Sequence, residues 1–262
     1  MTSTLELFSL KGKTVVVTGA GSGIGRAIAE GVAEAGASVV CAGRSDATGE
    51  TADGLRGNGA EALDIRTDVT DEAAVSHLMD ETVRKLGSLD VLFANAGTSD
   101  YYKRPDETPL EEWNDVIATN LTSVFLCVKH AARHMLDQGS GKIIPTASIW
   151  GEVGSGTIPV PGYAAAKGGI INLTRELALE YAPFGITVNA LSPGFFATGI
   201  GSDKDVPDGV IDRLVAAAIE AVPTHRIMDP AEIKGTAVYL ASAASDAMNG
   251  HVLTVDLGCL AR

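Results

Sequence analysis

A glycine-rich segment near the amino end constrains the fold more than any other part of the chain. Residues 18–25 read Thr-Gly-Ala-Gly-Ser-Gly-Ile-Gly, after a β-branched run at 13–18 and before a helical pattern at 24–35. A strand, a tight turn and a helix in this order open a parallel βαβ unit. The glycines let backbone N–H groups approach a phosphate-bearing ligand at the helix N-terminus, so the turn is a candidate binding site.

The alternation of strands and helices continues to the carboxyl end. Further strands are expected at 37–42, 61–66, 89–94, 142–147, 186–191 and 252–255, and further helices at 45–58, 71–86, 109–137, 162–181, 207–221 and 230–242. Apolar strands separated by helices favour a parallel sheet covered on both faces. The expected fold class is α/β, a doubly wound (Rossmann-type) parallel sheet of about seven strands with ligands beyond the carboxyl ends of the strands.

The length predicts one domain. With 262 residues, of which 45% are hydrophobic, the chain closes one large core but falls short of two domains of ordinary size. We expect residues 1–10 to form an amino-terminal tail and residues 11–262 to form a single Rossmann-type catalytic domain.

Charge and cysteine usage narrow the class of partner. Thirty-three acidic against twenty basic residues give a formal charge of -13, which disfavours nucleic acid and membrane surfaces as partners. Cys41, Cys127 and Cys259 form no CxxC pair, a pattern typical of reduced thiols. The first residues do not form a basic segment followed by a continuous apolar segment, as a signal peptide would. No stretch of the chain approaches about 18 consecutive apolar residues. These features predict a cytoplasmic protein.

A second motif suggests acid–base chemistry. Tyr163 and Lys167 are four residues apart in a predicted helix and therefore share a face. A nearby ammonium favours the phenolate and lowers the pKa of a tyrosine, which can then act as general acid and base. Ser148 ends the preceding strand, where its hydroxyl could hold a carbonyl oxygen. A Tyr-xxx-Lys pair alone is common on surfaces, so its weight depends on the other motifs.

Together with further motifs, the chain resembles the short-chain dehydrogenase/reductase family over residues 11–258. The additional motifs are Asp68-Val69, Asn95-Ala96-Gly97, Asn120, and Pro193-Gly194 with Thr198. The resemblance implies an NAD(P)-dependent oxidoreductase that transfers a hydride reversibly between a nicotinamide cofactor and a ketone or secondary alcohol. It also implies a homotetramer assembled through the helices near 109–137 and 162–181.

The resemblance further implies the roles of individual residues. Tyr163 would transfer the proton, Lys167 would bind the nicotinamide ribose, and Asn120 would hold a water that links Lys167 to solvent. The catalytic set it implies is Asn120, Ser148, Tyr163 and Lys167. The cofactor-binding set it implies is Gly19, Ser22, Gly23, Ile24, Gly25, Arg44, Ser45, Asp68, Val69, Asn95, Ala96, Gly97, Tyr163, Lys167, Pro193, Gly194, Phe196 and Thr198.

Arg44 is the candidate for cofactor selection. An acidic residue near the end of the second strand would accept the ribose hydroxyls of NAD, but this chain has Gly43-Arg44-Ser45 there. The missing carboxylate and the guanidinium fork together favour a 2′-phosphate. We therefore expect NADP(H) to be favoured, with NAD(H) as the alternative if Arg44 merely faces solvent.

Three loops that follow strands, at 97–108, 151–162 and 194–210, should surround the substrate. The predicted pocket residues are Trp150, Val153, Ile158 and Phe195, with Tyr101, Tyr102, Val160 and Phe196 nearby. Such a pocket favours an uncharged ketone or secondary alcohol. The alternative is a sugar-acid or polyol dehydrogenase of the same family, in which a basic residue pairs a carboxylate. The candidates for that pairing are Lys103, Arg104, His225 and Arg226.

Other interpretations carry less weight. A cofactor-binding regulator without turnover is disfavoured because the complete catalytic set is present. No metal is expected, since the segment His-Ala-Ala-Arg-His at 130–134 lacks the glutamate of HExxH. Two features depart from the expected pattern: Tyr163 follows Ser148 by fifteen positions, a longer interval than usual in the family, and Pro145 falls inside a predicted central strand.

Overall fold

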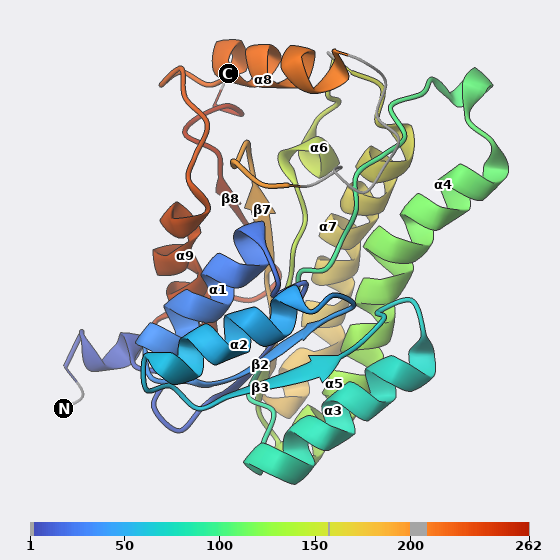
Figure 1. The fold of residues 1–262 in the computed structure, drawn as a ribbon. Helices are drawn as coiled ribbons and strands as arrows, with labels where there is room; N and C mark the ends of the chain where they lie inside the picture. The colour runs from blue at the N-terminus through green and yellow to red at the C-terminus, as the bar shows by residue number, and fades with distance from the viewer. Residues whose placement is uncertain (1–2, 157, 200–208, 262) are drawn as a thin grey trace.

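The computed structural model describes residues 3–156, 158–199 and 209–261 (Figure 1). The start of the helix predicted at 207 and much of the loop predicted at 194–210 lie outside these ranges. Six parallel strands form the main sheet in the order β3-β2-β1-β4-β5-β6. Their bounds are β1 Thr14–Thr18, β2 Ser38–Gly43, β3 Ala62–Arg66, β4 Val91–Ala94, β5 Gly141–Pro145 and β6 Ile186–Val188. A separate pair consists of β7 Ala190–Pro193 and β8 Val252–Val255.

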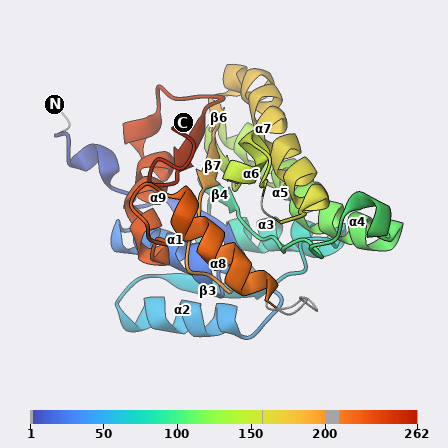
Figure 2. The same ribbon diagram turned by 90° about the horizontal axis from the view of Figure 1, so that it is seen from above.

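Helices cover both faces of the main sheet, as Figures 1 and 2 show. Their bounds are α1 Gly23–Glu34, α2 Ala47–Gly57, α3 Glu72–Leu86, α4 Leu110–Ile117, α5 Ser123–Gln138, α6 Ile149–Glu152, α7 Pro161–Tyr181, α8 Val210–Ala221 and α9 Lys234–Ala241. Val15 and Val17 of β1 pack with α1, α2 and α9, whereas Val16 packs with α3, α5 and α7. Successive side chains of β1 therefore point into two apolar layers, one on each face of the sheet. This arrangement confirms the predicted doubly wound class.

The strand predicted at 186–191 is two strands in the structure. Asn189 interrupts it: its side-chain N–H donates to Met248 O at 2.8 Å, and its side-chain oxygen accepts from His251 N at 3.0 Å. Before the break β6 pairs with β5, and after it β7 pairs with β8. Within the described ranges this gives eight strands, close to the seven predicted.

The same break accounts for Pro145. Asn189 N donates to Ile143 O, and Ala147 N donates to Leu191 O. This alternation places the missing N–H of Pro145 opposite Asn189, where the neighbouring strand is already interrupted. Proline is tolerated there because it ends β5 instead of lying in the middle of a continuous ladder.

The long helix predicted at 109–137 contains an irregular segment. α4 and α5 are joined by a π-helical turn, Ala118–Thr122. Asn120 lies within it, fully buried, and its side chain donates to Val116 O at 3.0 Å and accepts from Thr98 N at 3.1 Å. π-Helical turns inside helices often mark functional positions. This π-helical turn directs the side-chain amide of Asn120 toward the loop that follows β4.

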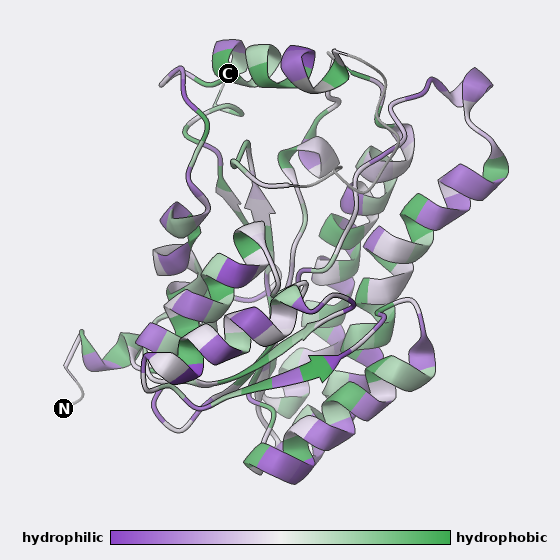
Figure 3. Cartoon of the chain, in the orientation of Figure 1, coloured by the Kyte–Doolittle hydropathy of each residue, from purple (hydrophilic) through white to green (hydrophobic). Residues whose placement is uncertain are grey.

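The helix boundaries follow local chemistry. Asp71 caps α3 by accepting from Ala73 N at 2.9 Å. Ser148 caps α6, a short helix that the sequence did not predict. Figure 3 shows hydrophilic and hydrophobic residues alternating along the outer helices, as expected where one side of each helix packs on the sheet. Among the described residues, no helix is both long and apolar enough to cross a membrane.

Candidate active site

A cavity of about 480 Å³ opens at the carboxyl ends of the central strands. Most of the predicted site residues line it, although they come from segments scattered along the chain. These lining residues are Gly19, Ser22, Gly23, Ile24, Gly25, Arg44, Ser45, Asn95, Ala96, Gly97, Asn120, Ser148, Trp150, Tyr163, Lys167, Pro193, Gly194, Phe195, Phe196 and Thr198. Asp68 lies beside it, 3.9 Å from Arg44, and Val69 is buried in the core against α3.

The glycine turn leaves no room for side chains. Gly19 and Gly23 have φ angles of +69° and +51°, which favour glycine. A Cβ on Gly25 would lie 2.1 Å from Gly19 O and 2.6 Å from the side-chain nitrogen of Asn95. The first turn of α1 therefore packs directly on the preceding loop. Ser22, its N-cap residue, makes no side-chain cap hydrogen bond, so this end of the helix has backbone N–H groups to offer a ligand.

Asn95 joins the ends of three strands. Its backbone N–H and its side-chain N–H donate to Thr18 Oγ1 and Thr18 O, at 3.0 and 3.1 Å. Its side-chain oxygen accepts from Thr146 Oγ1 at 3.2 Å. Two positions further on, a Cβ on Gly97 would lie 2.7 Å from Asn120 Oδ1 and 3.8 Å from Lys167 Nζ. The floor of the cavity is thus held by hydrogen bonds and close backbone packing.

Ser148, Tyr163 and Lys167 meet where α6 packs on α7. Lys167 is 3% exposed, and its Nζ lies 5.5 Å from the Tyr163 ring centroid and donates to Thr146 O at 2.6 Å. Ser148 Oγ accepts from Trp150 N at 3.2 Å. A Cβ on Gly151 would lie 2.6 Å from the Lys167 carbonyl carbon, so glycine allows α6 to approach α7 closely.

Burial controls the protonation of Tyr163 and Lys167. It raises the pKa of Tyr163 to about 12, although a hydrogen bond with Ser148 favours the phenolate and opposes the rise. Burial also lowers the pKa of Lys167 to about 7. The expectation that Lys167 brings the tyrosine pKa toward neutrality is therefore not met by these side chains alone. The cost of burying the phenolate charge exceeds the stabilisation that the Ser148 hydrogen bond gives to it.

Comparison with known proteins decides the family. The family model described as enoyl-(acyl carrier protein) reductase matches residues 19–259. The chain is 42% identical over 246 residues to cis-4-hydroxycyclohexanecarboxylate dehydrogenase of Sinomonas cyclohexanicum, covering 94% of this chain and 96% of that protein. The chain belongs to the short-chain dehydrogenase/reductase family. The predicted oxidoreductase class is thereby confirmed.

Solved structures of the family agree. A short-chain dehydrogenase/reductase from Mycobacterium marinum superposes with a TM-score of 0.92 at 38% identity, covering 99% of this chain and 100% of that one. A gluconate 5-dehydrogenase from Burkholderia cenocepacia, crystallised with NADP and tartrate, gives 0.89 at 33% identity, with the same coverage.

The cavity of this short-chain dehydrogenase/reductase suits the nicotinamide dinucleotide that the family implies. The turn of Gly19, Gly23 and Gly25 forms a narrow backbone cradle in which any Cβ would collide. Such a cradle at a helix N-terminus suits a diphosphate. At the far end, Lys167 supplies a buried donor within the same cavity. The donor set and the space therefore fit the group.

An apolar wall lines the end of the cavity beside Tyr163. The Trp150 ring makes edge-to-face contacts with Tyr163 and Phe195, at centroid distances of 6.1 and 5.9 Å. Tyr102, Val160 and Leu214 complete this wall.

Three side chains predicted near the substrate lie elsewhere. Val153 is 48% exposed beyond the end of α6. Ile158 is buried behind the wall, in a cluster with Tyr102 and Val210. Tyr101 turns away, and its hydroxyl donates to Asp115 of α4 at 2.9 Å. The apolar residues of the long loop after α6 thus differ in environment: Val153 is exposed, Ile158 packs with other segments and Val160 lines the cavity, which residue type alone did not reveal.

None of the four basic candidates for a carboxylate lines the cavity. Lys103 is paired with Glu112 at 2.6 Å, and Arg104 with Asp106 at 2.8 Å. Arg226 makes two hydrogen bonds to Glu232, and the ring of His225 is bonded to Ile219 O at 3.1 Å. The four basic side chains are therefore bonded to other groups outside the cavity. Arg44 does line the cavity, at its other end, with its side chain 64% exposed.

Sequence reasoning did not name seven of the lining residues: Ser99, Asp100, Thr146, Ala147, Ile149, Gly199 and Leu214. Ser99 Oγ is buried and has no hydrogen-bond partner among the residues that the structure describes, and Asp100 Oδ2 accepts from Tyr163 N at 2.8 Å. Both follow strand β4 closely, and the carboxyl ends of parallel strands meet at one edge of the sheet. Their position along the chain was therefore the available signal.

Proposed function

We propose that this enzyme reduces a ketone to a secondary alcohol, and catalyses the reverse oxidation, with NADP(H) as the favoured cofactor. The observation that carries the proposal is that the glycine cradle and the Ser148–Tyr163–Lys167 cluster line one cavity. The nicotinamide cofactor, when bound, supplies or accepts the hydride. Residues 11–262 act as one catalytic domain.

The chain's own residues manage the proton. Ser148 Oγ orients the carbonyl oxygen, and Tyr163 Oη donates its proton to the oxygen as negative charge develops there. Burial keeps Tyr163 protonated near neutral pH, the form that reduction requires. Lys167 Nζ, which donates to Thr146 O, holds the ribose side of the site. As the family resemblance implies, we expect Asn120 to hold a water behind it.

Arg44 supports the preference for NADP(H). The residue before it is glycine, so no carboxylate opposes a 2′-phosphate at this position, and the guanidinium lines the cavity. The Burkholderia cenocepacia relative was crystallised with NADP, which points the same way. NAD(H) remains the alternative cofactor.

The favoured substrate has an uncharged ring beside its carbonyl group. Trp150 and Phe195 form an apolar wall next to Tyr163, and the four basic candidates are engaged elsewhere. The second candidate is a sugar-acid or polyol dehydrogenase. The relatives named for cis-4-hydroxycyclohexanecarboxylate and gluconate favour it, as does the hydroxyl of Ser99, which has no partner within the described ranges.

Three ketones separate the two substrate classes. We would compare kcat/KM for 4-methylcyclohexanone, 4-oxocyclohexanecarboxylate and a keto sugar acid, each with NADPH and NADH, at the absorbance of reduced nicotinamide. We expect the neutral ketone to be the best substrate, with NADPH as the better cofactor. A keto sugar acid preferred by a decade or more would overturn the uncharged substrate class. 4-Oxocyclohexanecarboxylate has the same ring as 4-methylcyclohexanone but carries a charge, so it separates the effect of charge from that of ring shape.

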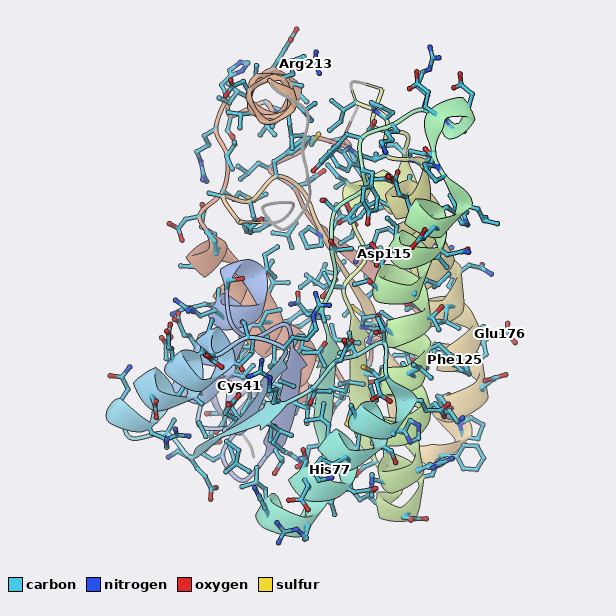
Figure 4. All side chains as sticks on the ribbon, turned by 45° about the vertical axis from the view of Figure 1, so that its right-hand side comes forward. Cys41, His77, Asp115, Phe125, Glu176 and Arg213 are labelled. Atoms are coloured by element: carbon cyan, nitrogen blue, oxygen red, sulfur yellow. The ribbon has the colours of Figure 1, made fainter. Side chains whose placement is uncertain are left out.

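The enzyme works as a cytoplasmic homotetramer joined through α5 and α7. Phe125 on α5 is 51% exposed, and Leu179 on α7 is 76% exposed. Figure 4 shows Phe125 and Glu176, on these two helices, on the same side of the molecule. Exposed apolar side chains on neighbouring helices suit burial in a subunit interface. Sedimentation of the wild type and of Phe125→Glu tests this: we expect a tetramer that dissociates in the variant.

A further inference from the structure

The helix that carries Tyr163 begins without a cap of its own. Val160 occupies the N-cap position of α7 and makes no side-chain cap hydrogen bond, and Pro161 has no backbone N–H. Ala164 N donates to Val160 O at 2.9 Å and so is already within the helical pattern. The N–H of Tyr163 comes before that pattern and needs an acceptor from outside the helix.

Asp100 supplies that acceptor from the loop after β4. Its Oδ2 lies 2.8 Å from Tyr163 N, although the two residues are 63 positions apart in the sequence. Its Oδ1 accepts from Tyr101 N at 2.8 Å, and the residue is only 2% exposed. The carboxylate is thus buried, fixed at both oxygens, and directed at the backbone of the residue that transfers the proton.

Gly162 makes this approach possible. A Cβ there would lie 3.3 Å from Asp100 Oδ2 and 3.2 Å from Val116 Cγ1, which is tighter than nearly all such contacts. A carboxylate at the amino end of a helix is also favoured by the helix dipole. The first turn of α7 is therefore shaped to receive a capping group from another part of the chain.

The loop that carries Asp100 also contacts the rest of the site. Two residues earlier, Thr98 N donates to Asn120 Oδ1 at 3.1 Å. Just before it, the segment from Asn95 to Gly97 lines the cofactor end of the cavity. Through Asp100, one loop therefore connects Asn120, the cofactor end and the backbone of Tyr163.

We propose that Asp100 is a positioning residue that sets Tyr163 relative to Ser148 and Lys167. The inference rests on the proposed function, in which Tyr163 transfers the proton. Asp100 touches no reacting atom in this role, so its loss affects turnover more than cofactor affinity. A displacement of about 1 Å at a reacting group can reduce the rate roughly 100-fold.

Three substitutions at Asp100 separate hydrogen bonding from charge. Asp100→Ala removes the acceptor, whereas Asp100→Asn and Asp100→Ser remove the charge but keep an oxygen that can cap the helix. Asp71→Ala is the matched control, because Asp71 caps α3 in the same way, by accepting from Ala73 N at 2.9 Å, but does not line the cavity. For each variant we would measure kcat, the Kd for NADPH by fluorescence, and Tm.

We expect Asp100→Ala to lower kcat roughly 10- to 100-fold while the Kd for NADPH stays nearly constant. Asp100→Asn should recover most of the lost turnover. Asp71→Ala should lower Tm without lowering kcat. The inference is overturned if Asp100→Ala retains wild-type kcat, if Asp100→Asn is as slow as Asp100→Ala, or if Asp71→Ala loses as much turnover.

Amide hydrogen exchange tests the cap without relying on activity. In Asp100→Ala, exchange at the amino end of α7 should accelerate, and in Asp100→Asn it should stay close to that of the wild type. Unchanged exchange in Asp100→Ala would overturn the inference even if no ketone were turned over. A wild type that binds NADPH but reduces none of the ketones would instead contradict the proposed function.

Discussion

The two ends of the cavity are built in different ways. At the cofactor end, Gly19 and Gly25 leave less than a side chain's width between turn and helix, so the shape is set by backbone. At the substrate end, side chains from three separate segments, Tyr102, Trp150 and Leu214, form the wall. Backbone geometry tolerates few substitutions, whereas a wall of side chains can change residue by residue. This contrast explains how one reaction class can be combined with many substrates.

The largest effect should come from the residue between the two ends. Tyr163→Phe should lower kcat roughly 10²- to 10⁴-fold, since the hydroxyl is needed for proton transfer. The Kd for NADPH should barely change, because the phosphate contacts lie at the other end of the cavity. Steady-state rates and a fluorescence titration measure the two quantities. Lys167→Ala, by comparison, should impair both, and an unchanged kcat in Tyr163→Phe would refute the mechanism.

A change at the cofactor end should alter selectivity without altering chemistry. Arg44→Ala should weaken NADPH binding by about 1.5–3 kcal/mol, roughly one to two decades of affinity, and leave NADH binding almost unaffected. The measurement is kcat/KM for both cofactors in wild type and variant. Equal losses for the two cofactors would mean that Arg44 does not contact the 2′-phosphate, and a wild type that prefers NADH would show the same.

The backbone-controlled end should be intolerant of a single methyl group. Gly25→Ala should reduce the free energy of unfolding by about 1–3 kcal/mol, since its Cβ would meet Gly19 O at 2.1 Å. Gly54→Ala is the control: it lies in α2 with nothing within 4 Å of the added Cβ and should stabilise by about 0.5–1 kcal/mol. Urea denaturation measures both. Equal free energies of unfolding for Gly25→Ala and Gly54→Ala would contradict the claim that close backbone packing sets the shape of the cofactor end.

The last prediction concerns the pH dependence of stability. Between about pH 7, the lowered pKa of Lys167, and its ordinary value of 10.5, the unfolded chain binds a proton that the folded chain does not. The free energy of unfolding should therefore rise with pH over this window, by up to about 1.4 kcal/mol per pH unit. Lys167→Met should flatten the rise, whereas Lys234→Met, at a surface lysine whose pKa Glu34 and Glu30 raise, should not. Parallel curves for wild type and Lys167→Met would show that Lys167 is not buried as described.

The sequence predicted the parts of this molecule that depend on local patterns. Strand β1, the glycine turn and α1 follow from residues that are neighbours in the chain. Arg44 lines the cavity because it directly follows strand β2 at the ligand edge. In each of these cases the information lies within one βα unit.

Features that depend on distant contacts were not predictable. The break at Asn189 requires partners in the segment before β8, and the π-helical turn at Asn120 accompanies a bond to the loop after β4. Ile158 was placed in the pocket because it is apolar, yet it packs with Tyr102 and Val210. Residue type indicates that such a side chain is buried, but only tertiary packing decides which surface it covers.

Transfer of a labelled hydride tests the central claim most directly. Reduced NADP carrying deuterium at the transferable position of either face would be incubated with 4-methylcyclohexanone, and the alcohol analysed by mass spectrometry. We predict that one of the two labelled forms gives alcohol with a single deuterium on the carbinol carbon, and that Tyr163→Phe gives almost none. Alcohol without label from both forms, or no alcohol from any ketone with either cofactor, would contradict the account.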